Sequence, residues 1–314
     1  MPVLGSDDPT AGSLALDLES VYERALEADR LAQENVGLKR RAAPVIEPIG
    51  HSPVIQRLRE QVKRVAQHDS WVLISGEPGS GRETFARYLH SHSPRRDRPF
   101  VDVGVSAISK GNAARELFGS EREGNIQYGR LEQAAGGTLF LDEVADMDLE
   151  AQAQLVGALD TGSFMRVGGS VPVSVDVRVI AATQRDLHKA VEEGKFREDL
   201  FYQLNVVPLV VPALRDHRED IPALLESAVD RLVEQDKLPY RRFSIGAQNV
   251  LRQHNWPGNI RELKNLVQRV LILGAGDEIA QNEVETALGS APPLPTQPLE
   301  GMVSFDQPLR QARE

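Results

Sequence analysis

The sequence predicts an α/β domain, with a parallel sheet flanked by helices on both faces, followed by a small all-helical lid subdomain. Up to residue 211, short apolar runs typical of buried strands alternate with segments of helical periodicity. A glycine-rich turn follows the first of these strands, and two acidic residues end a later one. From Arg218 onward the apolar spacing fits helices only. Ligand is expected at the carboxyl ends of the strands.

Length and composition narrow the classes of protein. With 314 residues and 41% hydrophobic content, the chain can bury one large core and a smaller one. The absence of cysteine excludes disulfides and thiolate chemistry. No apolar run approaches the roughly 18 residues of a membrane span, and no signal peptide is recognisable, so we expect a cytoplasmic protein without a membrane partner. A net charge of -10 argues against a broad DNA-binding face in these residues.

The most informative stretch is Trp71 to His92, which reads as a strand, a glycine-rich loop and a helix. Glycines from Gly76 to Gly81 allow successive backbone N–H groups to point at one anion, and the helix adds the positive end of its dipole. Phe85 and Leu89 fall on the inward face of that helix. This pattern predicts a triphosphate site, with a ligand-free glycine turn as the alternative.

The loop departs from the nucleotide-binding pattern G-x-x-x-x-G-K-[ST]. Gly76 and Gly81 satisfy it, but Arg82 replaces the lysine, Glu83 replaces the Ser or Thr that would reach Mg²⁺, and Thr84 comes one position late. A planar guanidinium can pair with phosphate oxygens, although it would lie differently over the β- and γ-phosphates.

Two carboxylates form a second chemical signal. Thr138 to Glu143 is an apolar strand that ends in Asp142 and Glu143. Beside a phosphate loop, the first acid can hold Mg²⁺ and the second can orient an attacking water molecule. The alternative is that Asp142 only caps a helix.

The remaining elements follow from periodicity and turn residues. Strands are expected at Phe100–Val105, Val177–Thr183 and Val206–Val211, with a hairpin over Met165–Val175. Helices are expected at Val54–Gln67, Asn112–Gly119, Met147–Leu159, Asp186–Glu193, Phe196–Leu204, Ile221–Gln235, Ile245–His254, Pro257–Leu273 and Asn282–Leu288. Pro257 should take the first helical position. Ser120 to Tyr128 is polar and without periodicity, so we predict a surface loop.

Four regions are expected along the chain: a disordered start and linker helix (1–42), an α/β subdomain (43–215), a helical lid subdomain (216–289) and a proline-rich linker (290–314). A weak apolar spacing from Leu14 to Arg41 is consistent with pairing between subunits or with a solvated connector.

Several long segments together resemble the AAA+ central domain of bacterial enhancer-binding (NtrC-type) transcription regulators, over residues 49–288. They are IGHSPVIQRL, GEPGSGRE, ELFGSE, GGTLFLDEVADM, FMRVGG, VDVRVIAAT, FREDLFYQLNVVPL, LRDHREDIPALL and WPGNIRELKNLVQR. In that family a receiver domain and a helical linker precede the region, and a helix-turn-helix domain follows it. The resemblance therefore implies a two-component response regulator that binds DNA through a C-terminal domain not present here.

The resemblance also implies ATP or ADP with Mg²⁺, bound between subunits of a homo-oligomer, a dimer or a ring. The implied nucleotide-binding residues are Ile49, Gly50, Gly76, Glu77, Pro78, Gly79, Ser80, Gly81, Arg82, Glu83, Thr84 and Arg261. Asp142 and Glu143 match the metal-binding and water-activating acids, so the metal site would be Asp142. Arg197 matches a catalytic arginine that the neighbouring subunit offers.

This sequence departs from the family at four positions of the catalytic constellation. Gln203 replaces the second arginine of the neighbouring subunit, and Gly104 replaces an asparagine that holds the acidic pair's glutamate. Gln184 stands at the strand-end sensing position, and Arg82 replaces the lysine. Phosphoryl transfer depends on positioned charge, and an arginine finger contributes a factor of roughly a thousand or more in rate. We therefore expect weak or absent hydrolysis.

The segment from Ser120 to Tyr128 is shorter than its family counterpart and lacks the GAFTGA tip that pushes sigma-54. Any contact with RNA polymerase would take another route. This pattern is similar to the NtrX-type response regulators. Three hypotheses remain: a regulatory nucleotide-binding module that sets oligomeric state, an active ATPase that remodels another transcription partner, and a structural domain with an empty site.

Overall fold

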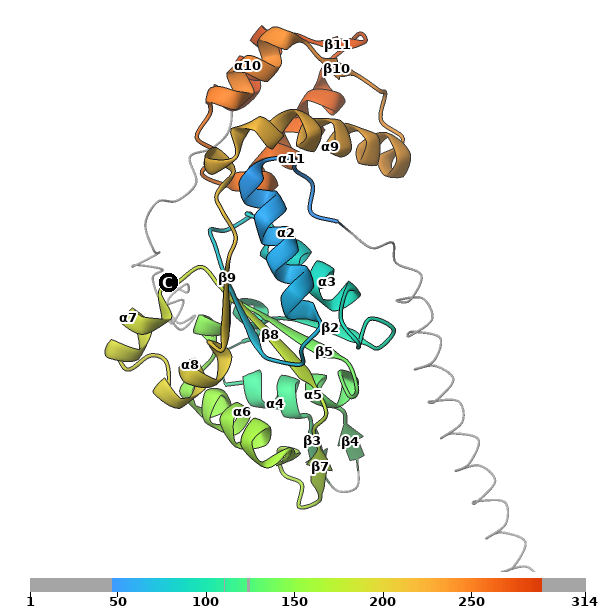
Figure 1. The fold of residues 1–314 in the computed structure, drawn as a ribbon. Coiled ribbons are helices and arrows are strands. Elements are labelled where there is room, and N and C mark those ends of the chain that lie inside the picture. Colours follow the sequence, from blue (N-terminus) through green and yellow to red (C-terminus); the bar gives the residue numbers. More distant parts are fainter. Residues whose placement is uncertain (1–46, 110, 123–124, 290–314) are drawn as a thin grey trace, which may run out of the picture. The chain divides into compact units, whose positions relative to one another are not determined.

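The computed structural model describes residues 47–109, 111–122 and 125–289 (Figure 1). The predicted linker helix and the proline-rich stretch lie outside these residues. The chain forms two compact units: the first runs to Pro212 without residues 78–80, and the second combines those three residues with the chain from Ala213. Within the described ranges, no helix is both long and apolar enough to cross a membrane.

The first unit is built on a five-stranded sheet, as the sequence predicts (Figure 1). All strand pairs in it are parallel, in the order β2-β5-β8-β1-β9. The strands are β1 (Val72–Ser75), β2 (Phe100–Gly104), β5 (Thr138–Asp142), β8 (Arg178–Thr183) and β9 (Val207–Val210). After β1 the chain crosses to the edge strand β2 and returns through β5 and β8. It then passes β1 and forms β9 on the other side of β1. Such a reversal of strand order places ligand sites at the carboxyl end of β1.

One face of the sheet is covered by α2 (Pro53–Ala66) and α3 (Arg82–Ser91). Side chains alternate along a strand, so Val72 and Ile74 point to this face while Leu73 points to the other. Ile55 and Leu58 of α2, three residues apart on one helical face, are buried in the same cluster. The Ser52 hydroxyl caps α2 by accepting from the Ile55 N–H.

The opposite face is covered by four short helices and one longer one. They are α4 (Ala113–Phe118), α5 (Arg130–Gln133), α6 (Leu149–Thr161), α7 (Leu187–Glu192) and α8 (Glu198–Leu204). Single 3-10 turns occur at Val105–Ala107 and Val144–Asp146. The largest buried cluster lies here, and it includes Leu139 and Leu141 of β5. The Asp148 carboxylate accepts from Ala151 N (2.8 Å) and so fixes the start of α6.

Two hairpins extend from the sheet. The predicted surface loop at 120–128 is wrong, because β3 (Ser120–Arg122) pairs antiparallel with β4 (Asn125–Gln127). The predicted hairpin over Gly168-Gly169 is confirmed by β6 (Ser163–Met165) and β7 (Pro172–Ser174). All three β4 residues are exposed, so no alternation of buried side chains marked this strand.

The second unit packs four helices around Trp256. They are α9 (Ile221–Asp236), α10 (Ile245–Gln253), α11 (Asn259–Leu273) and α12 (Gln281–Gly289), preceded by 3-10 turns at Leu214–Asp216 and Arg218–Asp220. Trp256 is fully buried, and its Nε1 donates to Leu251 O (2.9 Å). Two two-residue strands, β10 (Arg242–Phe243) and β11 (Glu278–Ile279), were not anticipated by the helical pattern.

The expected role of Pro257 at the first position of a helix is wrong. Helix α11 begins two residues later, with Gly258 as its N-cap. Trp256 and Asn259 have φ values of 51° and 52°, in the left-handed region that residues other than glycine rarely adopt. The chain therefore makes a tight turn through Pro257 before α11 starts.

Candidate functional site

The glycine loop joins the end of β1 to the start of α3, as the phosphate-loop pattern requires. Gly76 N donates to Thr183 O (3.2 Å), which fixes the loop to the carboxyl end of β8. Gly79 and Gly81 have φ values of 75° and 101°, and only glycine adopts such angles without strain. Gly81 O accepts from Phe85 N (3.1 Å) in the first turn of α3.

The tip of the loop, residues 78–80, belongs to the second unit. There Asn259 Nδ2 donates to Pro78 O (3.1 Å) and Arg261 N donates to Gly79 O (3.3 Å). The Ser80 side chain is buried, and its hydroxyl has no hydrogen-bond partner within the described residues. A buried hydroxyl without a partner is costly, and a phosphate oxygen bound in the loop would supply an acceptor. The loop therefore fits a nucleotide.

Arg82, the residue in the lysine position, is buried at the centre of the site. Its Nη1 donates to Gly76 O (2.7 Å). Its Nη2 donates to Asp142 Oδ1 (3.2 Å) and also to Glu143 Oε1. The Arg82 side chain is only 7% exposed, but Asp142 is 35% exposed and Glu143 11%, so the bond to Glu143 is the better shielded from bulk solvent. Three predicted site residues, Gly76, Asp142 and Glu143, therefore meet around the Arg82 guanidinium.

The acidic pair is held by backbone as well as by Arg82. β5 places Asp142 at its last position, and Glu143 follows with φ of 56° in the left-handed region. Glu143 Oε2 accepts from Gln184 N (3.3 Å) at the end of β8, so both carboxylate oxygens are engaged. Burial raises the pKa of Asp142, and the Arg82 charge opposes that rise.

Mg²⁺ does not fit this arrangement of side chains. The ion binds oxygen ligands at about 2.1 Å and keeps several water molecules, which requires open space beside the carboxylates. Here the Arg82 guanidinium lies directly against Asp142 and Glu143. Glu83, at the position of the metal-binding hydroxyl, is instead paired with Arg87 (2.7 Å). Among the described residues, no group of three or more potential metal ligands is assembled.

Sequence reasoning missed two charged residues that border the site. Arg87 pairs with Glu83 and, through Nη2, with Asp102 on β2 (3.3 Å). Burial and the nearby Glu83 charge raise the pKa of Asp102. The spacing of Glu83 and Arg87 by four residues on one helix was the available signal.

The segment that matches the adenine-packing region precedes α2. Ile49 is 39% exposed, while Gly50 is buried with φ of 147°. Arg59 Nη2 donates to Gly50 O (2.7 Å), which ties this segment to α2. Glu77 follows Gly76 in the loop, and Thr84 lies partly buried on α3.

Arg197, which the family resemblance assigns to catalysis in a neighbouring subunit, is the N-cap residue of α8. It is 42% exposed and pairs with Asp199 (2.7 Å). Gln203, which replaces the second such arginine, donates through Nε2 to Asp160 on α6. The Arg197 charge is therefore partly neutralised by Asp199, and Gln203 carries none.

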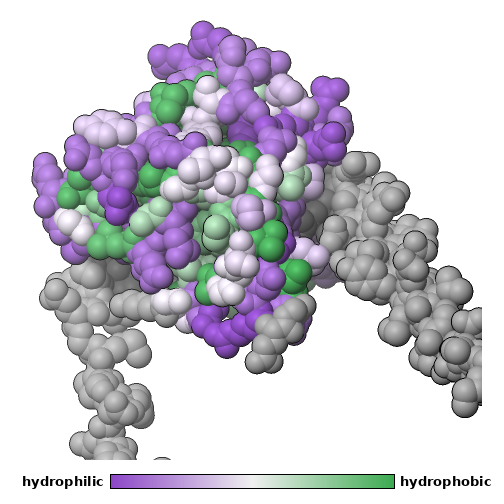
Figure 2. All heavy atoms as spheres, turned by 90° about the horizontal axis from the view of Figure 1, so that it is seen from below, coloured by the Kyte–Doolittle hydropathy of each residue, from purple (hydrophilic) through white to green (hydrophobic). Residues whose placement is uncertain are grey.

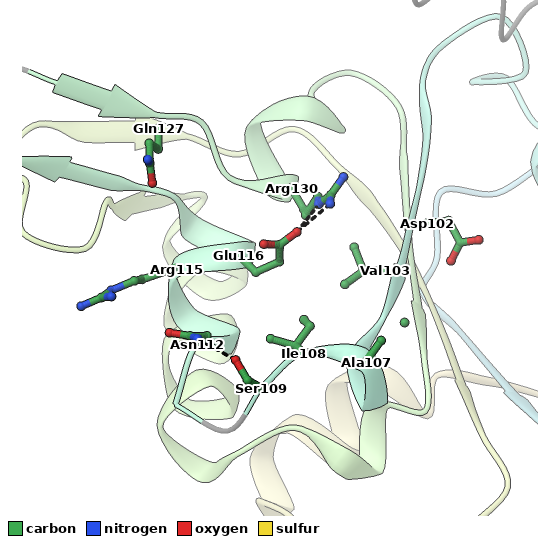
Figure 3. A pocket seen from close by; sticks show the side chains of 11 residues that line it. Asp102, Val103, Ala107, Ile108, Ser109, Asn112, Arg115, Glu116, Gln127 and Arg130 are labelled. Atoms are coloured by element: carbon green, nitrogen blue, oxygen red, sulfur yellow. Dashed lines mark hydrogen bonds and ion pairs between the residues drawn. The ribbon is translucent and has the colours of Figure 1, made fainter.

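A separate cavity of about 530 Å³ opens beside the carboxyl end of β2 (Figure 3). Gly104 is one of its lining residues and pairs in register with Asp142. A Cβ at Gly104 would meet Ala107 at 4.0 Å, which is an ordinary van der Waals contact. Glu116 and Arg130 both line this cavity and form an ion pair with each other (2.6 Å). None of the predicted nucleotide-binding residues lines it.

Comparisons with known proteins agree with this geometry. Residues 48–210 match the sigma-54 interaction domain, and residues 215–298 match the AAA+ ATPase lid domain. NtrC of Bradyrhizobium is 44% identical over 82% of this chain and 54% of its own length. NtrX of Azorhizobium caulinodans is 42% identical over 94% of this chain and 66% of its own length. The chain therefore spans half to two thirds of these curated relatives.

Solved structures of NtrX from Brucella abortus are similar throughout. The complex with ADP has a TM-score of 0.73 at 42% identity, covering 86% of this chain and 62% of that one. The complex with ATP has a TM-score of 0.74 at 40% identity, covering 91% and 64%. With its phosphate loop, acidic pair and helical lid, the chain belongs to the sigma-54 interaction family of AAA+ domains found in NtrC- and NtrX-like regulators.

Proposed function

We propose that this chain is the nucleotide-binding module of an NtrX-like transcription regulator, and that ATP or ADP in the glycine loop controls its oligomeric state. The backbone of residues 76–81 and the unpartnered Ser80 hydroxyl support binding. The relatives from Brucella abortus were crystallised with ADP and with ATP, which supports the same ligand class.

We propose further that hydrolysis is weak or absent. The observation that carries this is the bonding of Glu143, because Arg82 and Gln184 N occupy both oxygens that would orient water. A carboxylate bonded in this way is a poor general base. The family resemblance implies Mg²⁺ at Asp142, but the ion pair between Arg82 and Asp142 opposes metal binding there.

We propose that the hairpin of β3 and β4, whose segment lacks the GAFTGA sequence, does not make the sigma-54 contact of the family. Its exposed apolar residues are Ile126 and Tyr128, and Met165 and Val171 are exposed on the neighbouring hairpin. Figure 2 views the molecule from the side on which Figure 1 labels these hairpins, and hydrophobic patches are interspersed there with hydrophilic residues. DNA binding through a further domain and a cytoplasmic location complete the proposal.

Thermal unfolding with nucleotide, combined with a turnover assay, tests this function. Ligand at about 100 times its Kd stabilises the folded state by roughly 2.7 kcal/mol, which for a chain of this size raises Tm by about 4 to 5 °C. We expect that rise with ATP and with ADP, together with phosphate release no faster than in Glu143→Gln.

Two outcomes would favour the alternatives. The exposed Arg197 is the feature that favours an active ATPase, and turnover that disappears in Glu143→Gln would support that function. An unchanged Tm at millimolar ATP would support a structural domain with an empty site.

A further inference from the structure

The Arg82 guanidinium connects the phosphate loop to both acids. It bonds the Gly76 carbonyl in the loop, the Asp142 carboxylate at the end of β5 and the Glu143 carboxylate beyond it. All four residues belong to the first unit, so this arrangement is internal to one compact body. A divalent metal in a phosphate-loop site has the same task, because it links an acidic residue to the phosphate oxygens.

We propose that Arg82 is the resident cation of the site and takes the place of Mg²⁺ between the acidic pair and the nucleotide phosphates. This inference rests on the proposed nucleotide binding. A guanidinium has five N–H donors, and the three bonds above use three of them. Two donors therefore remain for phosphate oxygens while the bonds to Asp142 and Glu143 persist.

The charges make displacement of Arg82 by a metal unfavourable. Arg82 is 7% exposed and Glu143 11% exposed, so separating them would leave buried charges without partners. Mg²⁺ in solution would then compete with the protein for the phosphates instead of bridging the two. ATP should bind at least as well without the metal as with it.

Lysine at the same position would behave differently. Its ammonium is a compact charge with three donors, and it cannot bond two carboxylates in the planar geometry of a guanidinium. In Arg82→Lys the Asp142 carboxylate would be open to a metal ion. This variant should therefore convert metal-independent binding into metal-dependent binding.

Isothermal titration of the full chain with ATP, in EDTA and in excess MgCl₂, tests the proposal. We expect wild-type Kd values that agree within about twofold, or a tighter Kd in EDTA, and a Kd at least tenfold tighter with Mg²⁺ in Arg82→Lys. Arg95→Lys is the matched control, because Arg95 also bridges two carboxylates, Asp69 and Asp176, outside the site. It should respond to the metal as the wild type does.

Tenfold or greater tightening of wild-type binding by Mg²⁺ would overturn the inference and leave the proposed function intact. No binding in either buffer would overturn both. If Arg82→Lys fails to fold, as judged by circular dichroism, the comparison of the two wild-type titrations decides alone.

Discussion

At the residue scale, Arg82 is the side chain on which the site depends, because its guanidinium bonds the loop carbonyl and both acids. Its place after Gly81 marked it as the substitute for the phosphate-loop lysine. The direction of its side chain depends on Asp142 and Glu143, which are distant in sequence and meet it only through the register of the parallel sheet. The motifs place the two acids beside the loop, but they do not show which side chain each acid bonds, so the ion pairs with Arg82 could not be predicted.

His90 makes a pH-dependent contribution to the free energy of unfolding. It lies buried on α3 with Nδ1 2.9 Å from Thr138 Oγ1, and burial lowers its pKa from 6.5 to about 4. Between these values the unfolded chain binds a proton that the folded chain does not. The free energy of unfolding therefore falls as pH drops from 6.5 toward 4, by at most about 1.4 kcal/mol per pH unit from this group.

We expect His90→Asn to flatten that slope, as measured by urea unfolding at a series of pH values from 7.5 to about 4. His68→Asn is the control, because His68 is exposed, and it should leave the slope unchanged. An identical slope in the wild type and His90→Asn would show that another group causes the acid sensitivity.

Among the elements, the buried strands were predictable and the small hairpin was not. β5 and β8 are continuous apolar runs between turn residues, and a buried strand in a parallel sheet requires that pattern. The ladder of β3 and β4 depends instead on backbone contacts. Gly119 has φ of 74°, and a Cβ there would lie 2.2 Å from Gln127 O. A polar sequence does not reveal such a close approach.

The two hairpins are joined by Arg166, which is 11% exposed. Its guanidinium bonds Glu132 on α5 through Nε (3.0 Å) and Nη2 (2.6 Å), and Glu121 on β3 through Nη1 (3.4 Å). Glu121 N also donates to Val167 O (3.0 Å), so backbone bonds connect the hairpins beside this ion pair. Arg166→Ala should lower the free energy of unfolding by about 3 kcal/mol, because a buried carboxylate loses its partner.

Hydrogen exchange followed by mass spectrometry should also show faster exchange over residues 120–128 and 163–174 in Arg166→Ala. Arg130→Ala is the matched control, since the Arg130–Glu116 pair is 37% and 42% exposed and should contribute less than about 1 kcal/mol. Equal losses in the two variants, or unchanged exchange in the hairpins, would contradict this role for Arg166.

At the scale of the whole molecule, the residues of the glycine loop are divided between two compact units. Residues 78–80 belong to the second unit, while the residues on either side of them belong to the first. This division could not be derived from periodicity, because the loop lies within the α/β segment of the sequence.

Mass measurement during a titration with ATP or ADP, with bound nucleotide quantified in the same samples, tests the central claim most directly. Ligand that binds one association state better than another must shift the population toward that state. We predict that the average mass changes over the same nucleotide range as occupancy, without measurable turnover. A site that fills while the mass stays constant, or a chain that binds no nucleotide, would contradict the account.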